Sequence, residues 1–228
     1  MAETLLDLPG PFLVRLPGVY APQHDTRLLM GALDREGVRP GATVLDIGTG
    51  SGVLAVRAAQ LGGRVTAVDI SRRAVVTARL NAMLHRRRIT VRRDDLTSAV
   101  RAYAYAYDLV LCNPPYVPAP APDTPRHGAA RAWDAGTDGR AVVDRVCAGA
   151  PTALRRGGVL LMVHSGLCDP DASLRLLGHV GLNAVVSNRV RIPFGPVLLS
   201  RLNWLREQRL LDGEGTTEEL VVIRAERD

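Results

Sequence analysis

The 228-residue sequence contains no lysine, only three cysteines and few aromatic residues. Its 29 basic side chains are therefore all arginines, and with 23 acids they give a formal net charge of +6. This charge permits an acidic partner without requiring one. The densest basic runs, 86–88 and 92–93, flank one short predicted strand, and we find no separate recognition domain. Nucleic acid is therefore not the expected partner.

Cys112, Cys147 and Cys168 are odd in number and form no C-x-x-C pair. We interpret them as reduced thiols and predict neither a disulfide nor a metal site. The acidic start of the chain, interrupted by prolines, argues against a signal peptide. No segment approaches the roughly 20 apolar residues of a membrane span. The expected protein is cytoplasmic and has no membrane partner.

Apolar runs alternate with helical patterns along the chain, which is typical of an α/β protein with a mostly parallel sheet and helices on both faces. The hydrophobic fraction of 46% and the length predict a single domain over 1–228. Ser71 is the expected N-cap of the helix that ends at Leu84. The other predicted helices are 24–37, 52–61, 138–153 and 170–179, and the strands are 43–47, 64–69, 89–91, 107–112, 158–164, 182–190 and 219–225.

Three segments lie outside this regular pattern. Residues 1–40 form a predicted N-terminal helical extension. Residues 113–137 are too rich in proline for a central strand and form a loop, which we expect to hold substrate. Residues 191–212 form an insertion before the last strand.

The sequence 46–52, with glycines at Gly48, Gly50 and Gly52, follows the first predicted strand. The carboxyl ends of parallel strands form a ligand crevice, and glycines let the backbone approach a ligand closely. A dinucleotide site is an alternative, because residues 50–55 also satisfy G-x-G-x-x-A.

Acidic residues favour S-adenosylmethionine, which has an amino acid end and no phosphate. Asp46 would repel a phosphate and attract an ammonium group. Asp69, after the second strand, is positioned to accept hydrogen bonds from ribose hydroxyls, as in either cofactor class. Asp95, followed by Leu96, offers a carboxylate to an adenine amino group, whereas Asp94 is as well explained as a solvated acid that pairs with arginine.

Asn113, Pro114, Pro115 and Tyr116 directly follow the fourth strand and form the predicted reaction centre. An amide or aryl amine is a poor nucleophile because its lone pair is delocalised. Two acceptors, the Asn113 side-chain carbonyl and the Pro114 backbone carbonyl, would orient its N–H groups so that the lone pair faces the methyl donor. Proline holds its carbonyl rigidly, and Tyr116 offers a flat face to a planar group.

This chemistry depends on positioning and on stabilising the charge that develops on nitrogen. The sequence shows no dedicated general base, and none is required if the proton leaves after methyl transfer. His24, His127 and His164 are better interpreted as ordinary structural or surface histidines.

With both motifs, the chain resembles the class I methyltransferases and, among them, the short single-domain branch of the HemK-like family that methylates the glutamine of release factors. The likeness includes the segment 19–26, the glycine loop, Asp69, the Asp95–Leu96 pair, the segment 133–139 and the closing strand 218–222. It implies a Rossmann-like, seven-stranded sheet with an antiparallel last strand.

The resemblance also implies roles. Thr26 would touch the cofactor, Asp46 and Gly48 would hold its amino acid end, and Asn113 to Tyr116 would bind substrate. Ala21, His24 and Ala135 depart from the family pattern and bear on the identity of the protein substrate. Some members of this branch work with a small zinc-binding activator. Here arginines flank the edge strand, which discourages strand pairing, and we favour an enzyme that works without such a partner.

Three acceptors therefore remain open. The leading one is a glutamine amide in a protein such as a release factor, and the others are a base amine in DNA or RNA and a small metabolite. A scaffold that binds the cofactor without catalysis is disfavoured by the intact motif at Asn113.

Overall fold

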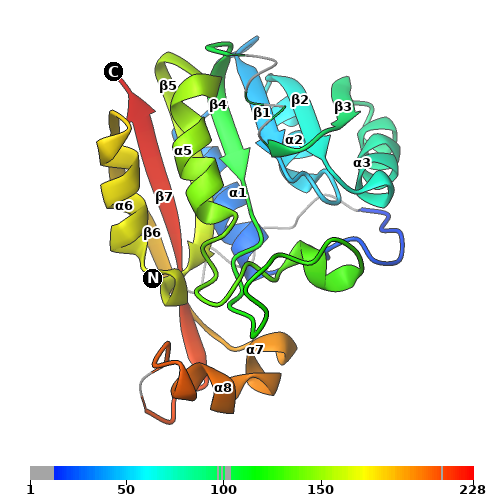
Figure 1. Cartoon of the computed structure of the whole chain (residues 1–228). Coiled ribbons are helices and arrows are strands. Elements are labelled where there is room, and N and C mark those ends of the chain that lie inside the picture. The colour runs from blue at the N-terminus through cyan, green and yellow to red at the C-terminus, as the bar shows by residue number, and fades with distance from the viewer. Residues whose placement is uncertain (1–12, 97, 99, 101–103, 212) are drawn as a thin grey trace.

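The computed structural model describes residues 13–96, 98, 100, 104–211 and 213–228. Within these residues seven strands form one sheet in the order β3-β2-β1-β4-β5-β7-β6 (Figure 1). The first twelve residues of the predicted N-terminal extension and residue 212 of the insertion lie outside the described residues. The strands are β1 (Thr43–Ile47), β2 (Arg64–Asp69), β3 (Ile89–Arg93), β4 (Tyr107–Cys112), β5 (Leu154–Ser165), β6 (Leu182–Pro193) and β7 (Thr217–Arg227).

Among these strands β7 runs opposite to the other six, and it pairs with both β5 and β6 in antiparallel register. The remaining pairs, from β3 across to β5, are parallel. This arrangement confirms the predicted Rossmann-like sheet with an antiparallel last strand. The strand order reverses at β1, which lies between β2 and β4, and such a reversal opens a crevice at the carboxyl ends of the strands.

Helices cover both faces of the sheet. On one face α1 contacts α2 and α2 contacts α3, while on the other face α5 contacts α6 (Figure 1). Ser71 caps α3 by accepting a hydrogen bond from the Ala74 amide, as predicted. The helices are α1 (His24–Glu36), α2 (Val53–Gln60), α3 (Arg72–Leu84), α5 (Val143–Ala153), α6 (Pro170–His179), α7 (Pro196–Ser200) and α8 (Leu202–Glu207), with 3₁₀ turns η2 (Ala129–Ala132) and η3 (Gly166–Cys168).

The structure corrects several predicted boundaries. The helix predicted to start at residue 138 starts at Val143, because the side chain of Asp138 accepts the Arg140 amide in a turn. The strand predicted from residue 158 starts at Leu154, which pairs with Tyr107 across a bulge. Strand β6 continues past residue 190 because Pro193 still pairs with Thr217. At β5 and β6, pairing with a neighbouring strand therefore decides the boundary.

All three cysteines are free and buried, as their interpretation as reduced thiols required. No helix of the described chain is long and apolar enough to cross a bilayer. The cytoplasmic location stays a prediction.

Gly52 joins the glycine loop to α2 in a left-handed conformation, with φ at 83°. A Cβ there would lie 2.9 Å from the Cβ of Ala78 on α3. Gly37 also has a positive φ, 75°, but a Cβ there would meet nothing within 4 Å. A non-glycine residue costs about 1–2 kcal/mol in the left-handed conformation of Gly52. It costs about 1–3 kcal/mol at Gly37, whose ψ of 157° lies in a region essentially limited to glycine. Overpacking adds about 1–3 kcal/mol only at Gly52.

Urea unfolding of Gly52→Ala and Gly37→Ala tests this packing. We expect the free energy of unfolding to fall by about 2–5 kcal/mol for Gly52→Ala, from backbone strain and overpacking together, and by about 1–3 kcal/mol for Gly37→Ala, from backbone strain alone. A loss of no more than about 1 kcal/mol for Gly52→Ala would show that α3 does not press on the glycine loop.

Candidate active site

A cavity of about 820 Å³ opens at the carboxyl ends of β1, β2 and β4. Its volume lies in the range of about 300–1,000 Å³ that is typical of small-molecule sites. It brings together most of the predicted site residues and adds the loop after β4 as a further wall. The predicted residues that line it are Thr26, Gly48, Gly50, Asp69, Asp95, Leu96, Asn113, Pro114, Pro115 and Tyr116.

The glycine loop is built by backbone conformations that favour glycine. Gly48, Gly50 and Gly52 have φ values of 69°, 54° and 83°. Gly48 donates its amide to the Val68 carbonyl, which ties the loop to the end of β2. Gly48 and Gly50 face the cavity without side chains, whereas Gly52 faces α3 and is not part of the lining. The three glycines thus serve two needs, close approach to a ligand and close packing of helices.

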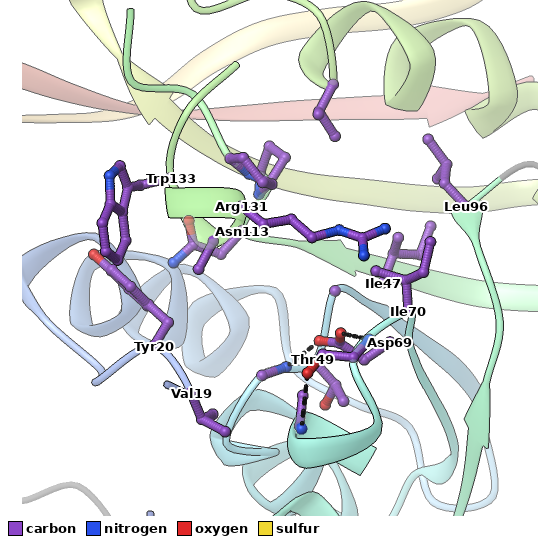
Figure 2. A pocket seen from close by; sticks show the side chains of 18 of the residues that line it. Val19, Tyr20, Ile47, Thr49, Asp69, Ile70, Leu96, Asn113, Arg131 and Trp133 are labelled. Atoms are coloured by element: carbon purple, nitrogen blue, oxygen red, sulfur yellow. Dashed lines mark hydrogen bonds between the residues drawn. The ribbon is translucent and has the colours of Figure 1, made fainter. Parts of the chain in front are cut away.

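Asp69 holds the glycine loop and the start of α3 at once. Its two carboxylate oxygens accept the amides of Gly50 at 2.9 Å and Ser71 at 2.8 Å (Figure 2). Burial raises the pKa of Asp69, while these hydrogen bonds and the charge of Arg131 oppose the rise. Each carboxylate oxygen retains acceptor capacity beyond one backbone hydrogen bond. Asp69 therefore fits the predicted role of accepting hydroxyl groups from a nucleoside.

Asp46 lies behind the glycine loop and is not part of the cavity lining. Its side chain is buried, and the Thr49 hydroxyl donates to Oδ2 at 2.5 Å. The other oxygen, Oδ1, is buried without a hydrogen-bond partner. Burial raises the pKa of this carboxyl to about 7. The sequence suggested that Asp46 contacts an ammonium group directly. In the structure Asp46 instead lies behind the glycine loop, as a buried hydrogen-bond acceptor.

Asp95 and Leu96 line the cavity beyond β3, on the side of Asp69. An ion pair of 3.8 Å joins Asp95 to Arg145 of α5, with both side chains about half exposed. Asp94 accepts the Asp95 amide on its side chain and donates its own amide to the Asp69 carbonyl. Asp94 is half-buried and lines the cavity, and these hydrogen bonds shape the turn beyond β3.

The side-chain amide of Asn113 is held in one orientation. Its nitrogen Nδ2 donates to Asp25 Oδ2 at 3.0 Å and to Thr26 Oγ1 at 3.2 Å. A carboxylate can only accept hydrogen bonds, so the nitrogen of the amide must face Asp25 and the oxygen must point away. Asp25 and Thr26 of α1 thereby orient the side-chain carbonyl oxygen of Asn113, which is the predicted hydrogen-bond acceptor.

Asp25 is the residue that the sequence interpretation missed. Its oxygen Oδ2 also accepts the hydroxyls of Tyr20 at 2.9 Å and Tyr116 at 3.1 Å. Its oxygen Oδ1 accepts the amide of Thr26 at 2.5 Å. Asp25 is 3% exposed, so these donors have little access to water as a substitute. The signal was the Tyr-x₄-Asp-Thr spacing, which was interpreted only through Thr26.

Tyr116 is buried, and hydrogen bonds hold both its backbone carbonyl and its hydroxyl. Cys168 donates its thiol to the Tyr116 carbonyl at 2.9 Å. A Cβ on Gly139 would collide with that carbonyl, so the chain packs closely here. Burial and the neighbouring Asp25 raise the pKa of Tyr116 well above its usual value, which keeps the phenol neutral and able to donate.

Glu218, at the start of β7, is a second buried acid near this cluster. It is 8% exposed, and its oxygen Oε2 has no hydrogen-bond partner. Burial raises its pKa to about 7, Ser165 opposes the rise by a hydrogen bond, and Asp25 adds to it. His164 is buried in the core and is not part of the cavity lining, whereas His127 is.

The loop after β4 supplies further lining residues, among them Trp133 and Arg131. Trp133 lies beside Tyr20 near the Asn113 amide, and Arg131 reaches across the cavity towards Asp69 and Ile70 (Figure 2). The cavity thus has an aromatic end at Asn113 and a polar end at Asp69. A planar acceptor suits the first end and a nucleoside the second.

The family model of the methyltransferase small domain matches residues 12–124. A Methanocaldococcus jannaschii protein assigned as an N5-glutamine methyltransferase is 31% identical over 86% of this chain and 96% of its own length. The release factor glutamine methyltransferase of Bordetella pertussis is 36% identical over 79% of this chain and 68% of its own length. The human methyltransferase HEMK2 is 31% identical over 74% of this chain and 82% of its own length. The chain belongs to the HemK-like methyltransferase family.

The fold is shared with the solved structure of E. cuniculi Mtq2 in its complex with Trm112. The two align with a TM-score of 0.65 at 24% identity, over 92% of this chain and 99% of that one. S-adenosylmethionine is the methyl donor of this class of enzyme. The cavity fits it: the glycine loop admits a close ligand, and Asp69 at the cavity wall has acceptor capacity for hydroxyl groups.

Asp25→Ala leaves the Asn113 amide and the hydroxyls of Tyr20 and Tyr116 without their shared acceptor. We expect methyl transfer to fall about 100-fold or more, because misplacement of a positioning group by about 1 Å has this effect. Cofactor affinity, measured by calorimetry, should change less than about threefold. A variant with normal turnover would show that Asp25 does not orient Asn113. Asp171→Ala, at an exposed position of α6 outside the cavity lining, is the control.

Asp46 makes the stability of the cofactor-free protein depend on pH. Its pKa of about 7 in the folded state exceeds the value of about 4 in an unfolded chain, so the folded state binds more protons between these pH values. Stability from this residue is therefore complete below pH 4 and is lost as the pH rises to 7. Asp46→Asn should raise the Tm by about 3 °C or more at pH 8 and by much less at pH 5. Equal shifts at both pH values would contradict the raised pKa.

Proposed function

We propose that this HemK-like protein transfers a methyl group from S-adenosylmethionine to the side-chain amide nitrogen of a glutamine in a protein, of the release-factor type. The observation that carries this proposal is the Asn113 amide, which Asp25 and Thr26 hold with its oxygen turned away from them. That oxygen is an acceptor for one N–H of a planar amide, and the cavity beside it is lined by Tyr20 and Trp133.

The cofactor, when bound, supplies an electrophilic methyl group on a sulfonium centre. The chain contributes orientation. The side-chain oxygen of Asn113 and the backbone oxygen of Pro114 each accept one N–H of the acceptor amide, so that the nitrogen lone pair points along the remaining direction. Both acceptors also stabilise the positive charge that develops on nitrogen as its lone pair bonds to the methyl group and the methyl–sulfur bond breaks. One N–H proton then leaves the nitrogen to solvent after transfer. The neutral phenol of Tyr116 holds Asp25 in place and takes no proton.

The relatives support a glutamine in a protein as the acceptor. The Bordetella pertussis relatives include a release factor glutamine methyltransferase and a ribosomal protein uL3 glutamine methyltransferase. The solved E. cuniculi complex is responsible for methylation of the eRF1 translation termination factor. Release factors act in translation, and we accordingly propose that this protein acts in the cytoplasm.

We also propose that the protein works without an activator subunit. The outer edge of the sheet is formed by β3, where Arg92 and Arg93 are exposed. The preceding residues 86–88 are exposed arginines as well. Charged side chains along an edge strand oppose the addition of a further strand.

The proposed acceptor is tested by incubating the purified chain with methyl-labelled cofactor and release factors. We expect label on the Gly-Gly-Gln loop, located by mass spectrometry of peptides, and we expect it without any added subunit. No label on that loop would contradict the proposal. Label on RNA, DNA or a metabolite from extract would identify one of the alternative acceptors.

Asn113 and Asp69 should separate transfer from cofactor binding. Asn113→Ala removes an acceptor for the amide, and we expect methyl transfer to fall at least about 100-fold while cofactor affinity stays within about threefold. Asp69→Ala should weaken cofactor binding first, since Asp69 holds the glycine loop. Calorimetry and initial rates measure the two effects. Unchanged turnover in Asn113→Ala would show that the proposed mechanism is wrong.

A further inference from the structure

The insertion before β7 forms a small hydrophobic core of its own. Helices α7 and α8 surround the buried side chains of Phe194, Leu198 and Leu205. These two helices lie below the sheet, next to the loop that follows β4 (Figure 1). Val117 of that loop packs against this core and also against the main core of the fold. The insertion and the loop are therefore packed together.

Arg201 lies between α7 and α8 and connects the insertion to both ends of the loop. Its nitrogen Nη1 donates to the Pro118 carbonyl at 2.8 Å and to Asp134 Oδ1 at 2.7 Å. The Arg201 side chain is 18% exposed and that of Asp134 11% exposed. An ion pair this far from water is weakly screened, and loss of one partner leaves the other buried without compensation.

The loop after β4 has a neck, where residues 117–118 of the outgoing chain lie beside residues 133–135 of the returning chain. The two groups that Arg201 contacts lie on opposite sides of this neck. Val117 pairs with Asp134 in an isolated bridge. The Val117 amide donates to the Trp133 carbonyl at 2.7 Å, and the Ala135 amide donates to the Val117 carbonyl at 3.0 Å. Arg201 thus holds the outgoing side of the neck at Pro118 and the returning side at Asp134.

This neck positions the wall of the cavity beside the reaction centre. Val117, Trp133 and Asp134 line the cavity, and Tyr116 immediately precedes the neck. The glycine loop and Asp69 on the cofactor side come from β1 and β2, and they share no hydrogen bond with Arg201 in the described part of the chain. A change at Arg201 therefore affects the acceptor side of the cavity first.

We propose that Arg201 is a positioning residue for the methyl acceptor, which it serves by closing the neck of the loop through Pro118 and Asp134. This inference rests on the proposed function, since it concerns the acceptor of that same site. It assigns the insertion a role in acceptor binding and makes the Arg201–Asp134 pair part of the specificity of the enzyme.

Steady-state kinetics of Arg201→Ala test the role. We expect kcat/KM for the protein acceptor to fall about tenfold or more, chiefly through KM, while cofactor affinity stays within about twofold. Arg201→Lys keeps the charge but loses the planar fork, and its loss should be intermediate. The charge exchange Arg201→Asp with Asp134→Arg should recover part of the loss. Arg224→Ala is the matched control, because Arg224 forms a partly buried ion pair with Glu36 away from the cavity.

Hydrogen exchange provides a readout that needs no acceptor. In Arg201→Ala the amides of Val117 and Ala135 should exchange at least about tenfold faster, because their bridge opens more often. Unchanged exchange at both amides would overturn the proposal. Faster exchange with an unchanged KM for the acceptor would also overturn it, since the neck would then not affect acceptor binding.

The two proposals fail in different ways. If the wild-type chain labels no glutamine, the proposed function fails, and the KM comparison is made with whichever acceptor the labelling experiment identifies. If the wild type labels glutamine but Arg201→Ala has the kinetics of Arg224→Ala, the inference about Arg201 fails alone. Loss of folding in Arg201→Ala shifts the test to Arg201→Lys, whose kinetics and exchange are judged by the same outcomes.

Discussion

A single buried carboxylate organises the acceptor side of this protein. Asp25 accepts hydrogen bonds from Tyr20, Thr26, Asn113 and Tyr116, and it is 3% exposed. Through these bonds the first helix, the end of β4 and the following loop share one anchor. Burial makes the arrangement specific, because any donor that moved away would lose its partner without gaining water. The orientation of Asn113, on which the proposed chemistry depends, follows from this anchor.

The two ends of the cavity are built by different physical means. At the cofactor end, left-handed glycines and backbone amides shape the loop, and Asp69 secures it by accepting two of those amides. At the acceptor end, side chains do this work through Asp25. Buried acids lie behind both ends, Asp46 behind the glycine loop and Glu218 near Asp25, and burial raises the pKa of each to about 7. Their charge is therefore sensitive to pH near neutrality.

Methyl transfer without a general base depends on geometry, and the loop after β4 is restrained accordingly. Cys168 holds the carbonyl of Tyr116, and Gly139 allows the chain to pack against it. Arg201 closes the neck a few residues later. A loop rich in proline and held at several points keeps its acceptor groups in place with little entropy left to lose.

Local patterns in the sequence were sufficient for the order of strands and helices, the glycine loop, and the placement of Asp69 and Asn113 at the ends of strands. Each of these depends on residues close in the chain, through periodicity, capping or turn preference. The starts of α5 and β5 were not predictable in this way, because a turn at Asp138 and pairing with Tyr107 decide them. Tertiary structure alone decided that Asp46 lies behind the glycine loop, that Asp25 meets Asn113 across 88 residues, and that Arg201 meets Asp134 across 67. Such contacts form only when the sheet brings distant segments together, and no local pattern encodes that distance.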